Sequence, residues 1–339
     1  MPDPSIVDAR LPSEADRLRS SFRSATPFPH VVIDGFLEAG LCRRLVESFP
    51  AYDDARFRNE WGEAVKAWRE DVSRLGPAWA ELDRGLRAAG FLELLSRISG
   101  IPRLLFDPTY FGGGTHENLH GMELDPHIDF NLHPETQLHR RLNLLLYLND
   151  GWDDAWGGAL ELHTNPWLPP AENHIKTISP AMNRCVIFET SDRSWHGFRR
   201  IALPPERRGL SRRSFAMYLY TRERPALPMI PHDITIYTDR PLPERICAGR
   251  TLTDEDVREL EVLLARRDRK LQYIYDRALE YAQPVLRLQS AARLRQALPV
   301  VAGLASRHLT ADIALGRGLR RLRDFARRAR DRMQRRGGG

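Results

Sequence analysis

The stretch from about residue 104 to residue 222 consists of short β-type runs separated by turn residues. Apolar and β-branched residues fill the runs, and Gly, Asn, Asp and Pro collect between them, which is typical of an all-β sandwich or barrel. We therefore predict a mainly β core with flanking helices (α+β), in which the core is a double-stranded β-helix, or jelly roll. The strands expected in it are 119–124, 142–148, 159–163, 175–178, 184–189, 196–201 and 214–221.

Helical patterns flank this region on both sides. The N-terminal part holds one expected strand at 29–36 and a helix-rich stretch at 60–100, whose apolar residues include Trp68, Val72 and Leu86. Further along, Thr253 can cap a helix. The predicted domains are 1–103 (N-terminal strand and bracing helices), 104–224 (jelly-roll core), 225–250 (Pro-rich linker) and 251–339 (helical, basic C-terminal region).

The net charge of +6 and the pI near 9.5 come from one end of the chain. From Arg287 onward there are fourteen Arg against three Asp, more than the whole excess. A basic amphipathic helix there fits a solvated terminus, a protein partner or an anionic membrane surface. Nucleic acid fits less well, because aromatic residues for base stacking are almost absent. The apolar stripe of this helix is expected to contain Leu315, Leu319, Leu322, Ala326, Ala329 and Met333.

Hydropathy and cysteine usage fit a folded cytoplasmic protein. No apolar run approaches the roughly 18 residues of a membrane span, and the first residues lack the basic and apolar regions of a signal peptide. The only thiols are those of Cys42, Cys185 and Cys247, without a CxxC pair. Neither a disulfide framework nor a structural zinc site is therefore expected.

Two histidines and one aspartate form a candidate metal site. His127 and Asp129 are two residues apart, so their side chains point to the same side of an extended chain. His196 is expected to join them from a different strand. A His-x-Asp triplet alone arises about once by chance in a chain of this composition, so its weight comes from its context. Two imidazoles and one carboxylate on one face of a metal leave the opposite face open, as non-haem Fe(II) oxygenases require.

A cation for an organic co-substrate follows on a later strand. A guanidinium matches a carboxylate through two parallel hydrogen bonds and stays charged at any working pH. Alternation along the strand puts Arg212 and Ser214 on one face and Arg213 on the other. Arg212 is therefore the candidate to hold the far carboxylate of a 2-oxo acid chelated to the metal, with Ser214 as an added hydroxyl. Arg213 remains the alternative.

The order His127-x-Asp129, His196, Arg212-x-Ser214 resembles the Fe(II)/2-oxoglutarate-dependent dioxygenase superfamily. Within residues 104–222, the run Tyr-Leu-Asn-Asp-Gly-Trp at 147–152 and the Gly-Gly pair at 157–158 resemble its prolyl 4-hydroxylase-like branch. The resemblance implies a cupin-like jelly roll, bound Fe(II), and 2-oxoglutarate and O2 as co-substrates, with ascorbate as a further candidate cofactor. It also implies that Tyr147 contacts the 2-oxoglutarate carboxylate.

These features predict a dioxygenase (hydroxylase) that oxidises an unactivated C–H bond, for which a prolyl residue is the best-known acceptor in the family that the chain resembles. No catalytic residue beyond the metal ligands is expected. The alternative is a non-catalytic jelly-roll binding module recruited through its basic helical tail. The acceptor, whether a small molecule or a peptide, stays open, because fold and cofactor do not determine it. The oligomeric state is open as well.

Overall fold

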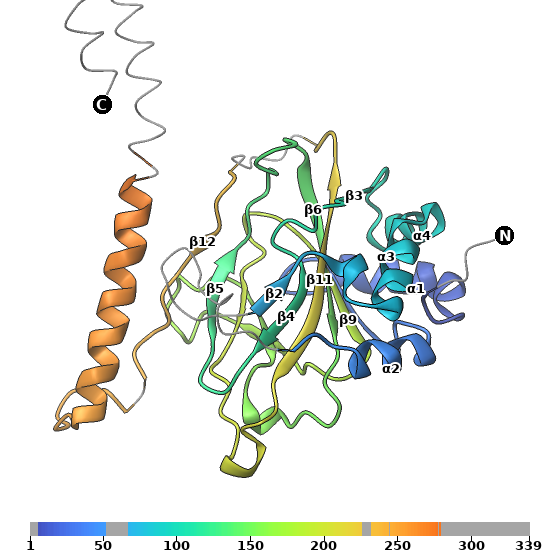
Figure 1. Ribbon diagram of the computed structural model, residues 1–339. Coiled ribbons are helices and arrows are strands. Elements are labelled where there is room, and N and C mark those ends of the chain that lie inside the picture. The colour runs from blue at the N-terminus through green and yellow to red at the C-terminus, as the bar shows by residue number, and fades with distance from the viewer. Residues whose placement is uncertain (1–5, 52–66, 226–231, 244, 277, 279–339) are drawn as a thin grey trace, which may run out of the picture. The chain divides into compact units, whose positions relative to one another are not determined.

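The computed structural model describes residues 6–51, 67–225, 232–243, 245–276 and 278. The chain divides into two compact units, Met1–Leu260 and Glu261–Gly339. The first unit contains the β core and the helices that pack on it (Figure 1). The predicted stripe from Leu315 to Met333 lies outside the described residues, and the boundaries between the four predicted domains stay predictions.

Seven antiparallel strands form the major sheet, in the order β1-β9-β6-β11-β4-β2, with β3 paired to β11. Long pairing joins its centre, where β11 runs alongside both β6 and β4. The expected strands at 29–36, 142–148, 184–189 and 214–221 all lie in this sheet. Its strands are β1 (His30–Asp34), β2 (Ala67–Arg69), β3 (Leu105–Phe106), β4 (Gly114–Asn118), β6 (His139–Tyr147), β9 (Arg184–Glu189) and β11 (Arg212–Thr221).

Five strands form the minor sheet, in the order β12-β5-β10-β7-β8. A small apolar cluster lies between the two sheets, with Tyr147 and Phe188 from the major sheet against Leu160 and Leu162 from the minor one. Two antiparallel sheets packed in this way confirm the predicted mainly β core with flanking helices. The strands of the minor sheet are β5 (Leu124–Ile128), β7 (Leu160–His163), β8 (Ile175–Ile178), β10 (His196–Phe198) and β12 (Ile236–Tyr237).

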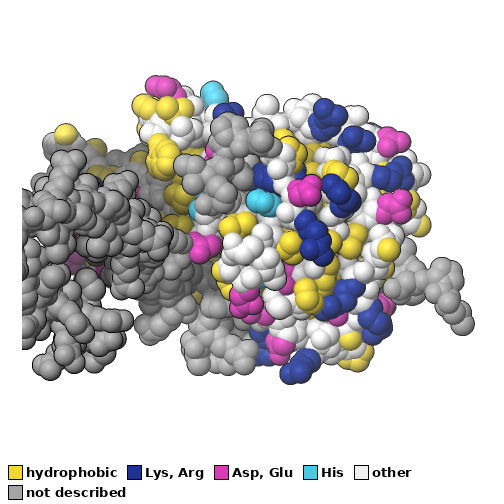
Figure 2. Space-filling model, turned by 90° about the horizontal axis from the view of Figure 1, so that it is seen from above, with side chains coloured by type: hydrophobic (Ala, Val, Ile, Leu, Met, Phe, Trp, Pro, Cys, Tyr) yellow, Lys and Arg dark blue, Asp and Glu magenta, His cyan; other side chains and the backbone are white. Residues whose placement is uncertain are grey.

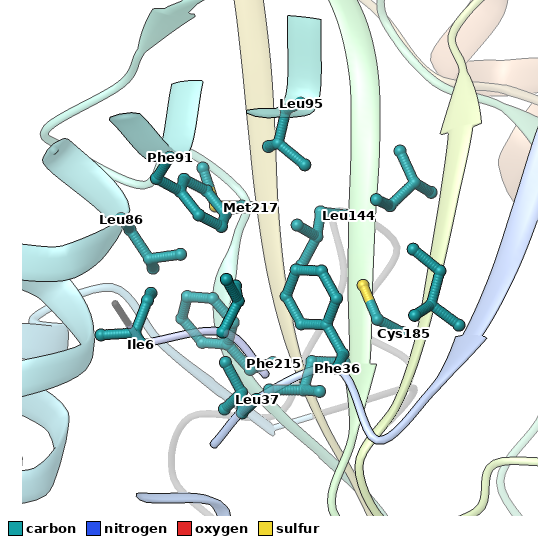
Figure 3. Packing of buried hydrophobic residues seen from close by; sticks show 14 of the residues in the cluster. Ile6, Phe36, Leu37, Leu86, Phe91, Leu95, Leu144, Cys185, Phe215 and Met217 are labelled. Carbon is teal, nitrogen blue, oxygen red and sulfur yellow. The ribbon is translucent and has the colours of Figure 1, made fainter. Parts of the chain in front are cut away.

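Four helices cover the other face of the major sheet (Figure 1). Alternation along β6 and β11 sends Leu144, Phe215 and Met217 toward the helices, where they pack with Phe36 and Phe91 (Figure 3). Each large apolar side chain buried in this way contributes about 1.5–3 kcal/mol. The helices thus support one face of the major sheet, and its other face packs on the minor sheet. They are α1 (Leu11–Ser24), α2 (Ala39–Glu47), α3 (Pro77–Arg87) and α4 (Ala89–Ser99), and short 3₁₀ turns occupy Val72–Arg74, Asp154–Trp156 and Pro205–Arg207.

Two local predictions were wrong. The expected strand at 119–124 is a turn between β4 and β5, because Gly121 has a φ of +85° and Met122 N donates to Leu119 O. The pattern missed β5 itself, since Pro126 lies in its middle and proline disfavours strands. Trp68 was placed on a helix, but it lies in β2, which pairs with β4.

The cap predicted for the C-terminal helix is confirmed. Residues 254–276 are helical. Thr253 Oγ1 accepts from Asp256 N at 3.2 Å, and Thr253 N donates to Asp256 Oδ2 at 3.0 Å, a reciprocal pair that satisfies two backbone donors at the helix start. Among the described residues, no helix is long and apolar enough to cross a membrane.

Charge on the face seen in Figure 2 is mixed, with basic and acidic side chains interspersed among apolar ones. The sequence explains this pattern. Fourteen Arg, three Asp and one Glu after residue 278 give that tail a net charge of +10, so the preceding residues carry a net charge of −4. The basic character of the chain therefore does not belong to the β core.

Candidate metal centre

The three predicted metal ligands meet at one end of the minor sheet. His127 lies in β5, Asp129 follows the last residue of that strand, and His196 begins the neighbouring strand β10, directly opposite His127. His127 Nε2 is 3.7 Å from Asp129 Oδ1, and His196 Nε2 is 3.5 Å from Asp129 Oδ2. One ligand atom from each residue lies within 4.8 Å of the others. This spacing fits a single metal ion.

Backbone carbonyls fix the orientation of both imidazoles. The Nδ1 atoms of His127 and His196 each lie 2.9 Å from a carbonyl oxygen, of Asp125 and Ser194 respectively. Because a carbonyl only accepts, each Nδ1 carries the proton and each Nε2 presents a lone pair toward Asp129. Burial lowers the pKa of His196, which favours the neutral ring that a metal needs. Two neutral imidazoles and one carboxylate are a donor set that fits Fe(II).

The carboxylate is held from the major sheet. Arg140 Nη2 and Asn143 Nδ2 both donate to Asp129 Oδ2, at 2.9 and 2.7 Å. Burial alone would raise the pKa of Asp129, but the charge of Arg140 and the hydrogen bond from Asn143 oppose it, and that pKa lies below its ordinary value. Asp129 is therefore charged, and both hydrogen bonds end on one oxygen, so Oδ1 is left for a metal.

A β-bulge aims Arg140 at this site. The register between β6 and β11 shifts between Leu219 and Tyr220, so that Leu219 faces Leu142 while Tyr220 faces Arg140. The extra residue changes the alternation and brings Arg140 to the same face as Asn143, whose Oδ1 accepts from Arg140 Nε at 2.9 Å. Without the bulge, simple alternation would put the two side chains on opposite faces.

Arg212 lies in the same space between the sheets, and Arg213 does not. The Arg212 side chain is buried, and its guanidinium stacks over the rings of Phe198 and Tyr147. It donates to Gly158 O at 2.5 Å, to Asn118 Oδ1 at 3.3 Å and to the Tyr147 hydroxyl at 3.4 Å. Among the described residues it has no carboxylate partner. Burial lowers the pKa of Arg212 and raises that of Tyr147.

Arg213 points to the opposite side, where its Nε is 3.4 Å from Glu117 Oε1, and its side chain is 38% exposed. Ser214 returns to the face of Arg212, with Tyr147 as its cross-strand partner. It is buried. The structure thus brings Arg212, Tyr147 and Ser214 together, and it separates Arg213 from them.

The loop from Asn149 to Gly158 secures the start of β11. The side-chain amide of Asn149 pairs with the backbone of Arg213 as a neighbouring strand would. Its Oδ1 accepts from Arg213 N at 2.6 Å, and its Nδ2 donates to Arg213 O at 3.0 Å. Gly158 has a φ of +72°, and a Cβ atom there would lie 3.0 Å from Arg212 Cδ. Glycine at this position therefore lets the backbone carbonyl approach the guanidinium.

A segment beyond β11 also covers the site. β12 pairs with β5, and the ring of Tyr237 stacks on that of His127 with centroids 5.1 Å apart. Arg240 fastens this segment to the minor sheet through Glu161 Oε2 at 2.9 Å and Leu124 O at 3.1 Å. This contribution was not predicted for residues 225–250, which were expected to form a Pro-rich linker, because two-residue strands have no recognisable period.

Sequence reasoning also missed the polar residues behind the ligands. Arg140, Asn143 and Asn118 occupy positions that alternation alone would not single out. The one available signal was their type: a strand as apolar as β6 carries Arg140 and Asn143 among leucines, and polar residues in such a strand need buried partners. The identity of the partner, Asp129, required the register of the bulge.

Residues 114–220 match the sequence profile of the 2OG-Fe(II) oxygenase superfamily. The prolyl 3-hydroxylase OGFOD1 of Mus musculus is 27% identical to this chain over 189 residues, which is 50% of this chain and 29% of that protein. The chain thus spans less than a third of the length of this curated relative. The matched profile extends from β4 through β11 and includes His127, Asp129, His196 and Arg212.

Solved structures with a similar course of the chain have low sequence identity. A prolyl 4-hydroxylase from Phytophthora capsici is 21% identical, with a TM-score of 0.42 and 79% of each chain covered. The non-haem α-ketoglutarate-dependent epimerase SnoN from nogalamycin biosynthesis is 16% identical, with a TM-score of 0.44, and the match covers 72% of this chain and 97% of that one.

Proposed function

We propose that this chain, whose residues 114–220 match the profile of the 2OG-Fe(II) oxygenase superfamily, is a 2-oxoglutarate-dependent dioxygenase that hydroxylates an unactivated C–H bond. In the proposed reaction the acceptor R–H, 2-oxoglutarate and O2 give R–OH, succinate and CO2. One oxygen atom enters the acceptor and the other enters succinate, so no further reductant is needed.

The observation that carries this proposal is the buried cation beside the metal centre. Arg212 is 5% exposed and has no carboxylate partner among the described residues. An unpaired buried guanidinium is costly, because its lost hydration is not replaced by an opposite charge. An anion from solution would supply that charge, and a carboxylate fits the guanidinium fork best. A dicarboxylate that reaches both the metal and Arg212 meets this requirement.

Each residue of the site has a distinct part in this proposal. His127, Asp129 and His196 would hold Fe(II) on one face and leave its other positions to ligands. When bound together, Fe(II) and 2-oxoglutarate supply the oxidative chemistry, which belongs to the cofactor rather than to the protein. Arg212 and the Tyr147 hydroxyl would orient the distal carboxylate of 2-oxoglutarate, and Ser214 would add a hydroxyl donor. No proton-transfer residue is required for the hydrogen-atom exchange at the acceptor.

We propose a prolyl residue in a peptide or protein as the first acceptor to test. The support comes from the relatives: OGFOD1 of Mus musculus is named as a prolyl 3-hydroxylase, and it matches half of this chain. A small-molecule acceptor is the second class to test, because the same iron site serves both. Ascorbate is proposed only as an additive that keeps iron reduced.

The non-catalytic alternative is less favoured, since a binding module has no need for three convergent metal ligands and an unpaired buried arginine. The location and the tail remain proposals of their own. We propose a cytoplasmic location from the reduced cysteines, which are unpaired among the described residues. We also propose that the basic region from Arg287 onward contacts a protein partner or an anionic membrane surface.

The two neighbouring arginines provide a matched test. Replacing Arg212→Met should weaken 2-oxoglutarate binding by about 100-fold, since a charge-assisted bidentate pair is lost. Arg213→Met changes the same residue type one position away and should leave binding within about twofold. The measurements are 2-oxoglutarate affinity by calorimetry with Mn(II) in place of Fe(II), and succinate formation with Fe(II) across a panel of prolyl peptides. Equal effects of the two substitutions, or a wild-type protein that binds no 2-oxoglutarate, would refute the proposal.

A further inference from the structure

We propose that Arg140 sets the charge of the metal centre, so that its cation opposes binding of the divalent metal alone and favours binding of an anion to the metal-loaded site. The proposal rests on the function proposed above, because it requires a divalent metal and 2-oxoglutarate at His127, Asp129 and His196. Arg140 is neither one of the three candidate metal ligands nor one of the two residues, Arg212 and Tyr147, proposed to hold the distal carboxylate.

Arg140 is fixed in place on every side. The residue is 1% exposed, and its guanidinium carbon lies 4.5 Å from the ring centroid of Phe130 and 3.4 Å from that of Tyr218. Phe130 and Tyr218 also contact each other edge to face. Two aromatic rings and two hydrogen-bonded partners keep the guanidinium away from solvent. Water therefore screens its charge less at the metal centre.

Orientation of the carboxylate does not depend on Arg140 alone. Asn143 Nδ2 donates to the same oxygen, Asp129 Oδ2, at 2.7 Å, slightly closer than Arg140 Nη2 at 2.9 Å. Asn143 is itself positioned by a second contact, since its Oδ1 accepts from Thr190 Oγ1 at 3.2 Å. What Arg140 adds, and Asn143 cannot, is a positive charge next to the ligand.

The charges predict effects of opposite sign on the two ligands. Before a metal binds, Arg140 balances Asp129 and the two imidazoles are neutral. When a divalent cation binds, the net charge of these groups rises to about +2. The positive charge of Arg140 makes this binding less favourable, and a 2-oxoglutarate dianion would neutralise the resulting charge. Arg140 therefore repels the metal and attracts the dianion. A residue with a purely structural role would change both affinities in the same direction.

Substitution Arg140→Met tests this directly, because methionine fills an aromatic enclosure without charge while Asn143 still holds Asp129. With Mn(II) as the probe, we expect the metal alone to bind several-fold to about tenfold more tightly, and 2-oxoglutarate to bind the Mn(II)-loaded protein about tenfold more weakly. Arg140→Lys keeps the charge and should stay within about threefold of wild type for both ligands. Calorimetry gives both affinities, and electron paramagnetic resonance of Mn(II) checks the first.

Asn143→Ala is the matched control, since it removes the other hydrogen bond to Asp129 Oδ2 and no charge. This substitution should weaken Mn(II) binding and should not strengthen the binding of either Mn(II) or 2-oxoglutarate. If Arg140→Met does not fold, as judged by circular dichroism, Arg140→Gln carries the same expectation. Same-direction changes, or no change, in the uncharged variants would overturn the role of Arg140. A wild-type protein that binds Mn(II) but no 2-oxoglutarate would instead refute the proposed function.

Discussion

Gly158 lies against Arg212 with a backbone conformation that side chains rarely adopt. Its φ is +72°, and an added Cβ would lie 3.0 Å from Arg212 Cδ and 3.1 Å from Ile201 Cγ1. We predict that Gly158→Ala lowers the free energy of unfolding by about 1–2 kcal/mol from backbone strain. Because the Gly158 carbonyl also accepts from Arg212 Nε, displacement of the guanidinium should weaken 2-oxoglutarate binding about tenfold. Denaturant unfolding and calorimetry measure the two effects.

Gly209 offers the control for this substitution. It lies in the loop that leads to β11, it is exposed, and a Cβ there meets nothing within 4 Å. Gly209→Ala should leave both the unfolding free energy and the 2-oxoglutarate affinity near wild type. If Gly158→Ala destabilised the protein without any effect on 2-oxoglutarate, the contact between Gly158 and Arg212 would be structural only.

Residue patterns predicted which side chains of the candidate site lie together better than they predicted the polar residues around them. The spacing of His127 and Asp129 and the alternation of Arg212 and Arg213 follow from the period of two residues in a strand, and the structure shows the expected faces. The hydrogen bonds to Asp129 could not be predicted from the sequence, because Arg140 faces Asp129 only as a result of the β-bulge. A residue pattern with a period of two does not show where a single extra residue shifts the strand pairing.

At the scale of elements, runs rich in β-branched and aliphatic residues were predicted to within a few residues. Two expected strands, 175–178 and 184–189, coincide with β8 and β9. Failures came where local chemistry and tertiary pairing disagree. β5 contains Pro126, which a propensity argument excludes, yet β5 is paired on both sides, with β10 and β12. Short strands such as β2 and β12 exist only through their partners, so no local signal marks them.

The attachment of β12 to the minor sheet predicts a dependence of stability on pH. Burial alone would raise the pKa of Glu161, but His163, Arg240 and Arg199 outweigh it and lower that pKa to about 2, from an ordinary value of 4.5. A carboxylate with a depressed folded-state pKa stabilises the fold above its unfolded pKa and loses this contribution as pH falls. We predict that the stability advantage of wild type over Glu161→Gln shrinks by about 2 kcal/mol between pH 6 and pH 3.

Urea unfolding at the two pH values measures this difference. Glu123→Gln is a suitable comparison, since Glu123 pairs with the half-exposed Arg200 at 3.1 Å and such pairs contribute little. Its effect on stability should stay below about 1 kcal/mol at both pH values. An advantage of wild type over Glu161→Gln that is constant with pH would show that Glu161 is not held charged by Arg240 and its neighbours.

On the scale of the whole molecule, charge and chemistry belong to different parts of the sequence. The metal centre draws its residues from both sheets of the β core, and 1–278 carries a net charge of −4. The residues after 278 carry +10. A net-charge argument applied to the entire chain would suggest a basic catalytic domain, and that inference is wrong for 1–278. Any electrostatic attraction to an anionic surface must therefore come from the tail.

Removing residues 279–339 separates ligand binding at the metal centre from attraction to an anionic surface. We predict that a chain ending at residue 278 binds Mn(II) and 2-oxoglutarate within about twofold of the full chain, because every contact described at the site lies before residue 241. The same truncation should abolish sedimentation with vesicles that contain phosphatidylserine, since each basic residue near such a surface contributes about 1 kcal/mol. Vesicles of phosphatidylcholine alone are the control, and added salt should release the full chain. Equal sedimentation of both chains would exclude the tail as the source of membrane attraction, whereas absence of binding by either would favour a protein partner.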